Sequence, residues 1–134
     1  MVEINNLSKK YRKIDKNFLK KVAQKILKAE GVKSNEEISI AIIDSLEIKK
    51  LNKQYRKKNR PTDVLSFGKV REEIAEIVIC PEEVEKNGKD FKKELIEVLI
   101  HGVLHLLSYD HEKKKSDAEV MFKKQKEYLS KVKF

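Results

Sequence analysis

Several residue types are scarce in this chain, and each scarcity excludes a class of protein. There is no tryptophan, and the 134 residues include one cysteine, two prolines and four glycines. The single cysteine, Cys80, forms no disulfide within the chain, which favours a reducing compartment. Because Cys80 ends an apolar run, we expect it to be a small buried hydrophobic residue.

Long hydrophobic runs are also missing. No apolar stretch reaches the ~20 residues that a membrane-spanning helix requires. The N-terminal residues MVEINNLSKKYRK lack the apolar core of a signal peptide. The sequence therefore predicts a cytoplasmic protein without a membrane partner.

Positive charge is concentrated in the first part of the chain. The formal net charge is +9, from 31 Lys and Arg against 22 Asp and Glu. Residues 1–60 hold 17 basic and 7 acidic side chains, a net charge of +10, whereas residues 61–134 hold 14 and 15, a net charge of −1. This asymmetry favours a polyanionic partner, most often nucleic acid. The alternative is a solvated lysine-rich surface, which charge-rich, heat-adapted sequences also carry.

Hydrophobic periodicity predicts one domain over residues 1–134, without a repeat or a linker. Strands are expected over residues 2–7, 37–43, 64–67 and 74–80, with a hairpin connection at 70–73. Helices are expected from residue 15 or 17 to 30, from 45 through 55, over 91–107 and over 116–131, with a turn of helix near 82–88. The order β-α-β-α-β-β-α-α predicts an α+β fold, in which helices pack on a mixed, mostly four-stranded sheet.

Polar residues before the apolar stripes are expected to cap these helices. The expected caps are Asp15 or Asn17, then Ser45, Asp90 and Ser116. The helix that starts at Ser45 is expected to bury Leu46, Leu51 and Tyr55.

The sequence holds only three histidines, and all lie within the eleven residues HGVLHLLSYDH, at His101, His105 and His111. Residues four apart on a helix lie on one face, with Cβ atoms about 5–6 Å apart, so His101 and His105 point the same way. His111 can join them only if the chain leaves the helix and turns back. The spacing predicts a metal site on the penultimate helix and the turn that follows it.

Three imidazoles with an open fourth position are typical of catalytic zinc, because structural zinc sites normally have four protein ligands. Imidazole also binds nickel and copper, but one Zn²⁺ ion is the first choice. A water bound to it would have its pKa lowered toward ~7. Asp110, beside His111, is expected either to orient an imidazole or to accept a proton from that water; the alternative is an aspartate that serves only the turn.

The three histidine offsets equal those of the metzincin metalloprotease pattern H-E-x-x-H-x-x-G-x-x-H. Gly102 replaces the glutamate that acts as general base in that pattern, and Ser108 replaces the turn glycine. The metal ligands are therefore retained, but peptide hydrolysis loses its usual proton acceptor. A helical glycine costs about 1 kcal/mol relative to alanine. The missing side chain of Gly102 is expected either to leave space for substrate or to permit close packing.

Three segments of the chain match one known family, in the order in which they occur there. They are LNKQYR (51–56) with PTDVLSF (61–67), IVIC (77–80) after an acidic residue, and HGVLHLLSYDH (101–111). In these segments the chain resembles the YbeY family of bacterial rRNA-maturation endoribonucleases. It differs from the family pattern at Ser108, where glycine is usual, at Ala75-Glu76 in place of Gly-Asp, and at Gly68 in place of proline. Ser108 matters if its backbone φ must be positive, which serine tolerates poorly.

The resemblance implies that His101, His105 and His111 are zinc ligands and that Arg56 is needed for activity. A guanidinium can hold a phosphate through two hydrogen bonds and stabilise charge that builds during cleavage. Without the resemblance, Arg56 is one more cation in a basic loop. The implied function is a zinc-dependent, single-strand-specific endoribonuclease in 16S rRNA 3′-end maturation and ribosome quality control. The implied partner is single-stranded rRNA of the small ribosomal subunit, with no DNA expected.

Two other functions stay open at the level of sequence. One is a metal-stabilised RNA-binding factor for ribosome assembly, whose metal has no catalytic role. The other, less favoured, is a metallopeptidase-like hydrolase, which here lacks the glutamate base. For the nuclease, three roles of the zinc are compatible with the residues: polarising a phosphate oxygen, delivering hydroxide, or activating the ribose 2′-hydroxyl.

Overall fold

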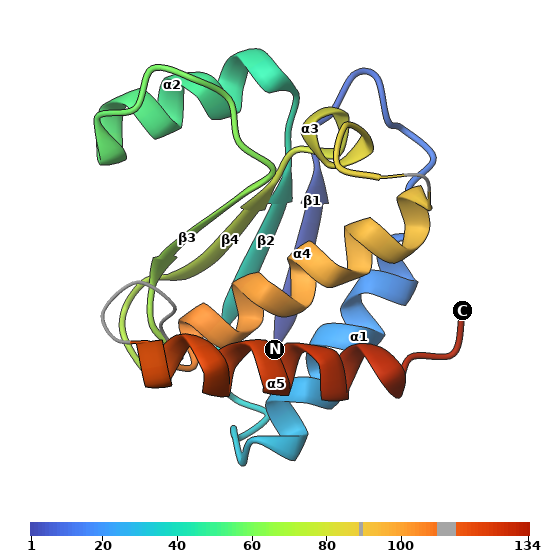
Figure 1. The fold of residues 1–134 in the computed structure, drawn as a ribbon, viewed down its shortest axis with the longest axis vertical. Coiled ribbons are helices and arrows are strands. Elements are labelled where there is room, and N and C mark those ends of the chain that lie inside the picture. Colours follow the sequence, from blue (N-terminus) through green and yellow to red (C-terminus); the bar gives the residue numbers. More distant parts are fainter. Residues whose placement is uncertain (89, 110–114) are drawn as a thin grey trace.

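The computed structural model describes residues 1–88, 90–109 and 115–134, and it confirms the predicted α+β order (Figure 1). The elements are β1 Val2–Asn6, α1 Lys16–Ala29, β2 Ile38–Ile42, α2 Ser45–Arg56, β3 Val64–Gly68, β4 Ala75–Ile79, α3 Pro81–Glu85, α4 Phe91–Leu106 and α5 Lys115–Ser130. Within these described ranges, none of the helices combines the length and the apolar character that crossing a membrane requires.

The sheet is mixed and has the strand order β1-β2-β4-β3. Strands β1, β2 and β4 are parallel, and β3 runs antiparallel to β4 at the edge. The hairpin between β3 and β4 requires glycine at Gly68. Its φ is +74°, and a Cβ there would lie 1.7 Å from the carbonyl oxygen of Ile74. Gly68 stands where proline is usual in the family that the sequence resembles. The positive φ and the close approach of Ile74 explain why this chain has glycine there.

The two faces of the sheet have different cores. On one face, isoleucines of β2 and β4 pack against α1, α4 and α5; they are Ile38, Ile40, Ile42, Ile77 and Ile79. On the other face, a smaller cluster joins Val78 and Cys80 to Ile48 of α2. Cys80 is fully buried, which confirms the expectation of a small hydrophobic residue. Figure 1 shows α4 lying across the sheet and α5 crossing the outer side of α4.

Two of the predicted helix caps are confirmed. The carboxylate of Asp15 accepts a hydrogen bond from the amide of Phe18 at 3.1 Å, at the start of α1. The carboxylate of Asp90 accepts one from the amide of Lys93 at 3.2 Å, at the start of α4. These bonds satisfy amides that the first turn of a helix leaves without an internal acceptor.

The other two predicted caps are wrong. Helix α2 begins at Ser45, so the cap position is Asp44. The Ser45 hydroxyl instead donates to Glu83 at 2.7 Å, and this bond ties α2 to α3. Helix α5 begins at Lys115, so Ser116 lies inside the helix. Sequence shows which residues can cap a helix, but the tertiary contacts of Ser45 decide where its hydroxyl is used.

The predicted buried side of α2 is also wrong in part. Leu46 and Tyr55 are 64% and 59% exposed, and Leu51 is half-buried. The side chains that α2 buries are Ile48 and Asn52. Apolar periodicity does not predict a buried asparagine, and the Asn52 side chain is satisfied by a hydrogen bond to the carbonyl of Arg60 in the loop that follows α2.

Helix α4 ends in a Schellman motif, with Ser108 in the left-handed region at φ 76°. The amide of Tyr109 donates to the carbonyl of Leu104 at 3.0 Å, and the amide of Ser108 donates to that of His105 at 3.0 Å. The condition under which serine at this position matters, a positive φ, is therefore met. This motif turns the chain sharply after the two helical histidines.

We predict that Ser108→Gly stabilises the protein, because glycine adopts a positive φ without the steric cost that an L side chain has. The expected gain is about 0.5–1 kcal/mol in the free energy of unfolding, after the larger chain entropy of unfolded glycine is subtracted. Denaturant titration measures it. The control is Ser116→Gly, at an exposed serine inside α5, which should destabilise by a similar amount. A loss of stability at both positions would contradict the prediction.

Candidate active site

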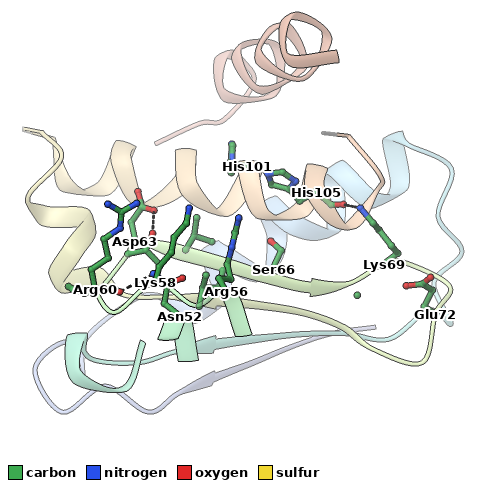
Figure 2. Close-up of a pocket in the computed structure, with 15 residues that line it drawn as sticks. Asn52, Arg56, Lys58, Arg60, Asp63, Ser66, Lys69, Glu72, His101 and His105 are labelled. Carbon is green, nitrogen blue, oxygen red and sulfur yellow. Dashed lines mark hydrogen bonds between the residues drawn. The ribbon is translucent and has the colours of Figure 1, made fainter. Parts of the chain in front are cut away.

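A cavity of about 790 Å³ lies between the end of α2, the strand β3 and the helix α4 (Figure 2). Arg56, His101 and His105, which sequence analysis singled out from two distant segments, all line it. Arg56 is the last residue of α2, and both histidines are in the second half of α4. The fold thus brings three of the five predicted site residues to one cavity.

The two helical histidines converge on one point. The Nε2 atoms of His101 and His105 are 3.1 Å apart, and both rings are partly exposed to the cavity. Two nitrogens bound to one tetrahedral zinc at 2.0–2.1 Å are separated by about 3.3 Å. The pair therefore fits two ligands of a single ion. At the same distance, one ring can also donate a hydrogen bond to the other.

Gln125 of α5 fixes the orientation of His101. Its Oε1 lies 2.9 Å from Nδ1 of His101, and its Nε2 donates to Glu97 at 3.4 Å. Because a carboxylate only accepts, the amide nitrogen faces Glu97 and the amide oxygen faces the imidazole. The Nδ1 of His101 therefore carries the proton, and the lone pair of Nε2 points toward His105. Such a partner for the non-ligating nitrogen is usual for metal-binding histidines.

The remaining predicted site residues, Asp110 and His111, lie outside the described residues, and their roles stay predictions. Within residues 1–88, 90–109 and 115–134, no three His, Cys, Asp or Glu side chains gather in a metal-binding arrangement. The described part of the chain thus holds two of the three predicted ligands.

The chain that leads toward His111 is anchored by Glu30, at the end of α1. The Glu30 carboxylate accepts hydrogen bonds from the hydroxyls of Tyr109, at 2.6 Å, and Tyr128, and it pairs with Lys124 at 3.6 Å. Burial raises the pKa of Glu30, but the hydrogen bonds from the two tyrosines and the charge of Lys124 outweigh it, so this pKa lies below its usual value. The bond to Glu30 raises the pKa of Tyr109 to about 12. Glu30 therefore joins α1, α5 and the turn after α4.

A basic loop forms the wall opposite the histidines. Its shape depends on Asn52, whose side-chain amide donates to the carbonyl of Arg60 at 2.9 Å and whose own carbonyl accepts from the amide of Lys58. Lys57, at φ 58°, ends α2 in the left-handed region. Figure 2 shows Arg56 and Lys58 pointing across the cavity toward α4. Cations of this loop therefore face the histidine pair.

The hairpin between β3 and β4 closes the cavity at the end of α4. The ammonium of Lys69 donates to the carbonyl of His105 at 3.1 Å, and the amide of Val70 donates to that of Leu106 at 2.8 Å. Both bonds satisfy carbonyls at the end of a helix, where the dipole favours positive charge. Asn52, Lys69 and Gln125 were all missed by sequence reasoning. Lys69 and Gln125 depend on contacts between distant segments, and Asn52 depends on the path of the loop after α2; no spacing signal exists for any of them.

Gly102 lies between the two histidines, on the side of α4 that faces the sheet. A Cβ at this position would lie 2.8 Å from Cγ2 of Ile77 in β4. Of the two expectations for Gly102, the structure therefore supports close packing. The carbonyl of Gly102 also lies 3.5 Å from the hydroxyl of Ser66, a residue of the cavity wall.

We predict that Glu30→Gln lowers the free energy of unfolding at pH 7 by about 2 kcal/mol, because it removes a partly buried charged acceptor. The pKa of Glu30 is lower in the folded than in the unfolded state, so its contribution is complete above about pH 4.5 and is lost as the pH falls through the folded-state value. Unfolding at a series of pH values should show wild type and variant converging in acid.

The control for this experiment is Glu127→Gln, which removes a carboxylate of α5 that is 48% exposed and pairs only at the surface with Lys131. Surface pairs contribute little, so this variant should match wild type at every pH. If the free energies of unfolding of wild type and Glu30→Gln differed by the same amount in acid as at pH 7, the role given to the Glu30 charge would be contradicted.

This chain is similar to known proteins over most of its length. The family model described as Endoribonuclease YbeY matches residues 3–133. Endoribonuclease YbeY of Thermotoga maritima is 42% identical over 119 residues, which cover 85% of this chain and 78% of that protein. Endoribonuclease YbeY of Persephonella marina is 41% identical over 132 residues, which cover 90% and 86%.

A solved structure is similar over nearly the whole fold. The solution structure of TM1509 from Thermotoga maritima shares 39% sequence identity, covers 96% of this chain and 87% of its own, and superposes with a TM-score of 0.70. The match to the family model includes the segments that hold Arg56 and the histidine pair. The chain therefore belongs to the YbeY family of endoribonucleases.

Proposed function

We propose that this protein is a zinc-dependent endoribonuclease that cleaves single-stranded RNA in the cavity between α2 and α4. The observation that carries the proposal is the convergence of the His101 and His105 Nε2 atoms, 3.1 Å apart, in the cavity that Arg56 also lines. His111 is the proposed third ligand. The biological role proposed is 16S rRNA 3′-end maturation and ribosome quality control in the cytoplasm, on rRNA of the small ribosomal subunit.

The protein's own side chains have separate tasks in this proposal. Arg56 holds the phosphate to be cleaved and stabilises the charge that develops on it. Lys58 and Arg60, on the same wall, hold the neighbouring phosphates of the strand. Gln125 keeps the proton of His101 on Nδ1, and Asp110 is the proposed proton acceptor. When bound, the zinc supplies a Lewis acid and a water of lowered pKa.

A metallopeptidase-like activity is disfavoured by the position of Gly102. The general-base glutamate of the protease pattern would stand there, but the Cβ direction of Gly102 leads into Ile77 of the sheet, not into the cavity. A carboxylate at this position could not serve the histidine pair without moving α4. The other alternative, an RNA-binding assembly factor with a structural metal, is separated from the proposal by experiment.

We predict that the purified protein binds one zinc per chain and cleaves single-stranded rRNA fragments, and that His105→Ala abolishes cleavage and reduces bound zinc. Metal analysis and an RNA cleavage assay on the same preparations measure both. Cleavage that survives in a variant shown to lack zinc would exclude a catalytic metal. If the wild type binds RNA and loses thermal stability on chelation but never cleaves, the structural-metal alternative is correct.

We predict that Arg56→Ala keeps the zinc content of the wild type and lowers kcat about a hundredfold, which is typical when one stabilising donor is removed from a developing oxyanion. The control is Lys50→Ala, which removes an exposed cation of α2 that does not line the cavity. Lys50→Ala should cleave like the wild type. Equal rates for the two variants would remove Arg56 from the mechanism.

A further inference from the structure

A second cavity lies on the other side of His101. It has a volume of about 470 Å³ and is formed between α4 and the first turns of α5. Its walls include the apolar side chains Ala118, Met121 and Phe122. His101 lines both cavities, so the second one borders the proposed site of cleavage.

The aromatic ring of Phe122 is the largest apolar surface at this second cavity. Phe122 is 56% exposed, whereas its neighbour Met121 is buried in the core. The ammonium of Lys126 lies over one face of the Phe122 ring, 4.8 Å from its centre, and Lys115 also lines the cavity. An exposed aromatic ring with cations beside it is the arrangement by which proteins bind single-stranded nucleic acid, because bases stack on the ring and phosphates approach the cations.

The chemistry of the walls fits a base better than a phosphate. Pockets that take a base from a strand have apolar or aromatic walls with few polar groups. Here Glu119 contributes the one carboxylate among the described lining residues, and Lys115 and Lys126 balance its charge. Gln125, which also lines this cavity, is already bonded to His101 and Glu97. The surface available to a ligand is therefore mainly the face of the Phe122 ring that Lys126 does not cover.

We propose that the second cavity binds one nucleobase of the RNA substrate, adjacent to the phosphate that is cleaved, with Phe122 as the stacking surface. This inference rests on the proposed function, because the two cavities adjoin at His101, so a strand held in the first reaches the second with its next nucleotide. Phe122 is then a substrate-binding residue that determines where a strand is held relative to the histidine pair. Lys126 attracts the phosphate of the stacked nucleotide.

The test compares zinc-loaded wild type, Phe122→Ala and Phe134→Ala on a short single-stranded oligoribonucleotide. Phe134 is the matched control, because it is also 56% exposed but does not line either cavity. Phe122→Ala should lower kcat/KM roughly fivefold to a hundredfold, the range for alanine substitution beneath a stacked base. Phe134→Ala should match wild type.

A second arm tests the base itself. The oligoribonucleotide is made with one abasic nucleotide, scanned through the positions on either side of the cut. At one position, the abasic nucleotide should lower the kcat/KM of the wild type as much as Phe122→Ala does on the intact substrate. At that position, combining the abasic nucleotide with Phe122→Ala should lower kcat/KM no further than either change alone. The inference would be overturned if Phe122→Ala lowered kcat/KM by the same factor on every abasic substrate. It would also be overturned if Phe122→Ala cleaved with the kinetics of the wild type.

Failure of the proposed function can be told apart from failure of this inference. A 2-aminopurine placed at the identified position, or scanned if no cleavage occurs, reports stacking by its quenched fluorescence in stopped-flow mixing, before any cleavage. Quenching by wild type and by Phe134→Ala, but not by Phe122→Ala, supports the base site even if the protein cleaves nothing. Cleavage without such quenching would leave the endoribonuclease intact and exclude the base site.

Discussion

The close contact between α4 and β4 at Gly102 sets the geometry of the whole site. A methyl group at this position would lie 2.8 Å from Ile77, so α4 can approach the sheet this closely only with glycine. The two histidines on either side of Gly102 are carried by this helix, whereas Arg56 comes from α2. Because the two walls belong to different elements, the depth at which α4 packs decides how far the imidazoles lie from the guanidinium. Glycine destabilises a helix by about 1 kcal/mol relative to alanine. The close packing of α4 against β4 requires glycine despite this cost.

The edge strand β3 places the basic loop that precedes it at the wall of the cavity. The basic excess of residues 1–60 ends in the loop after α2, and β3 begins directly behind that loop, beside α4. The antiparallel hairpin then returns to β4 and places Lys69 at the end of α4. Cations therefore stand at the wall and at one end of the cavity that the histidines line. Among the residues that line this cavity, the cations Arg56, Lys58, Arg60 and Lys69 outnumber the anions Asp63 and Glu72, which favours attraction of a phosphate backbone.

Local signals in the sequence were sufficient for the order of the elements, the Asp15 and Asp90 caps and the histidine pair. Each of these follows from residues within one or two helical turns of each other. The exposed Tyr55, the use of the Ser45 hydroxyl and the partnership of Gln125 with His101 depend on contacts across the fold, which no short pattern contains. The resemblance supplied Arg56, and the cavity supplies the physical reason for it.

Histidine side-chain nitrogen NMR during zinc titration is the most direct test of the proposed metal site. Since Gln125 Oε1 lies 2.9 Å from Nδ1 of His101, one equivalent of zinc should shift the Nε2 resonances of His101 and His105 together, while Nδ1 of His101 stays protonated. Coordination through Nδ1 of His101, or Nε2 resonances that one equivalent of zinc leaves unchanged, would contradict the site described above.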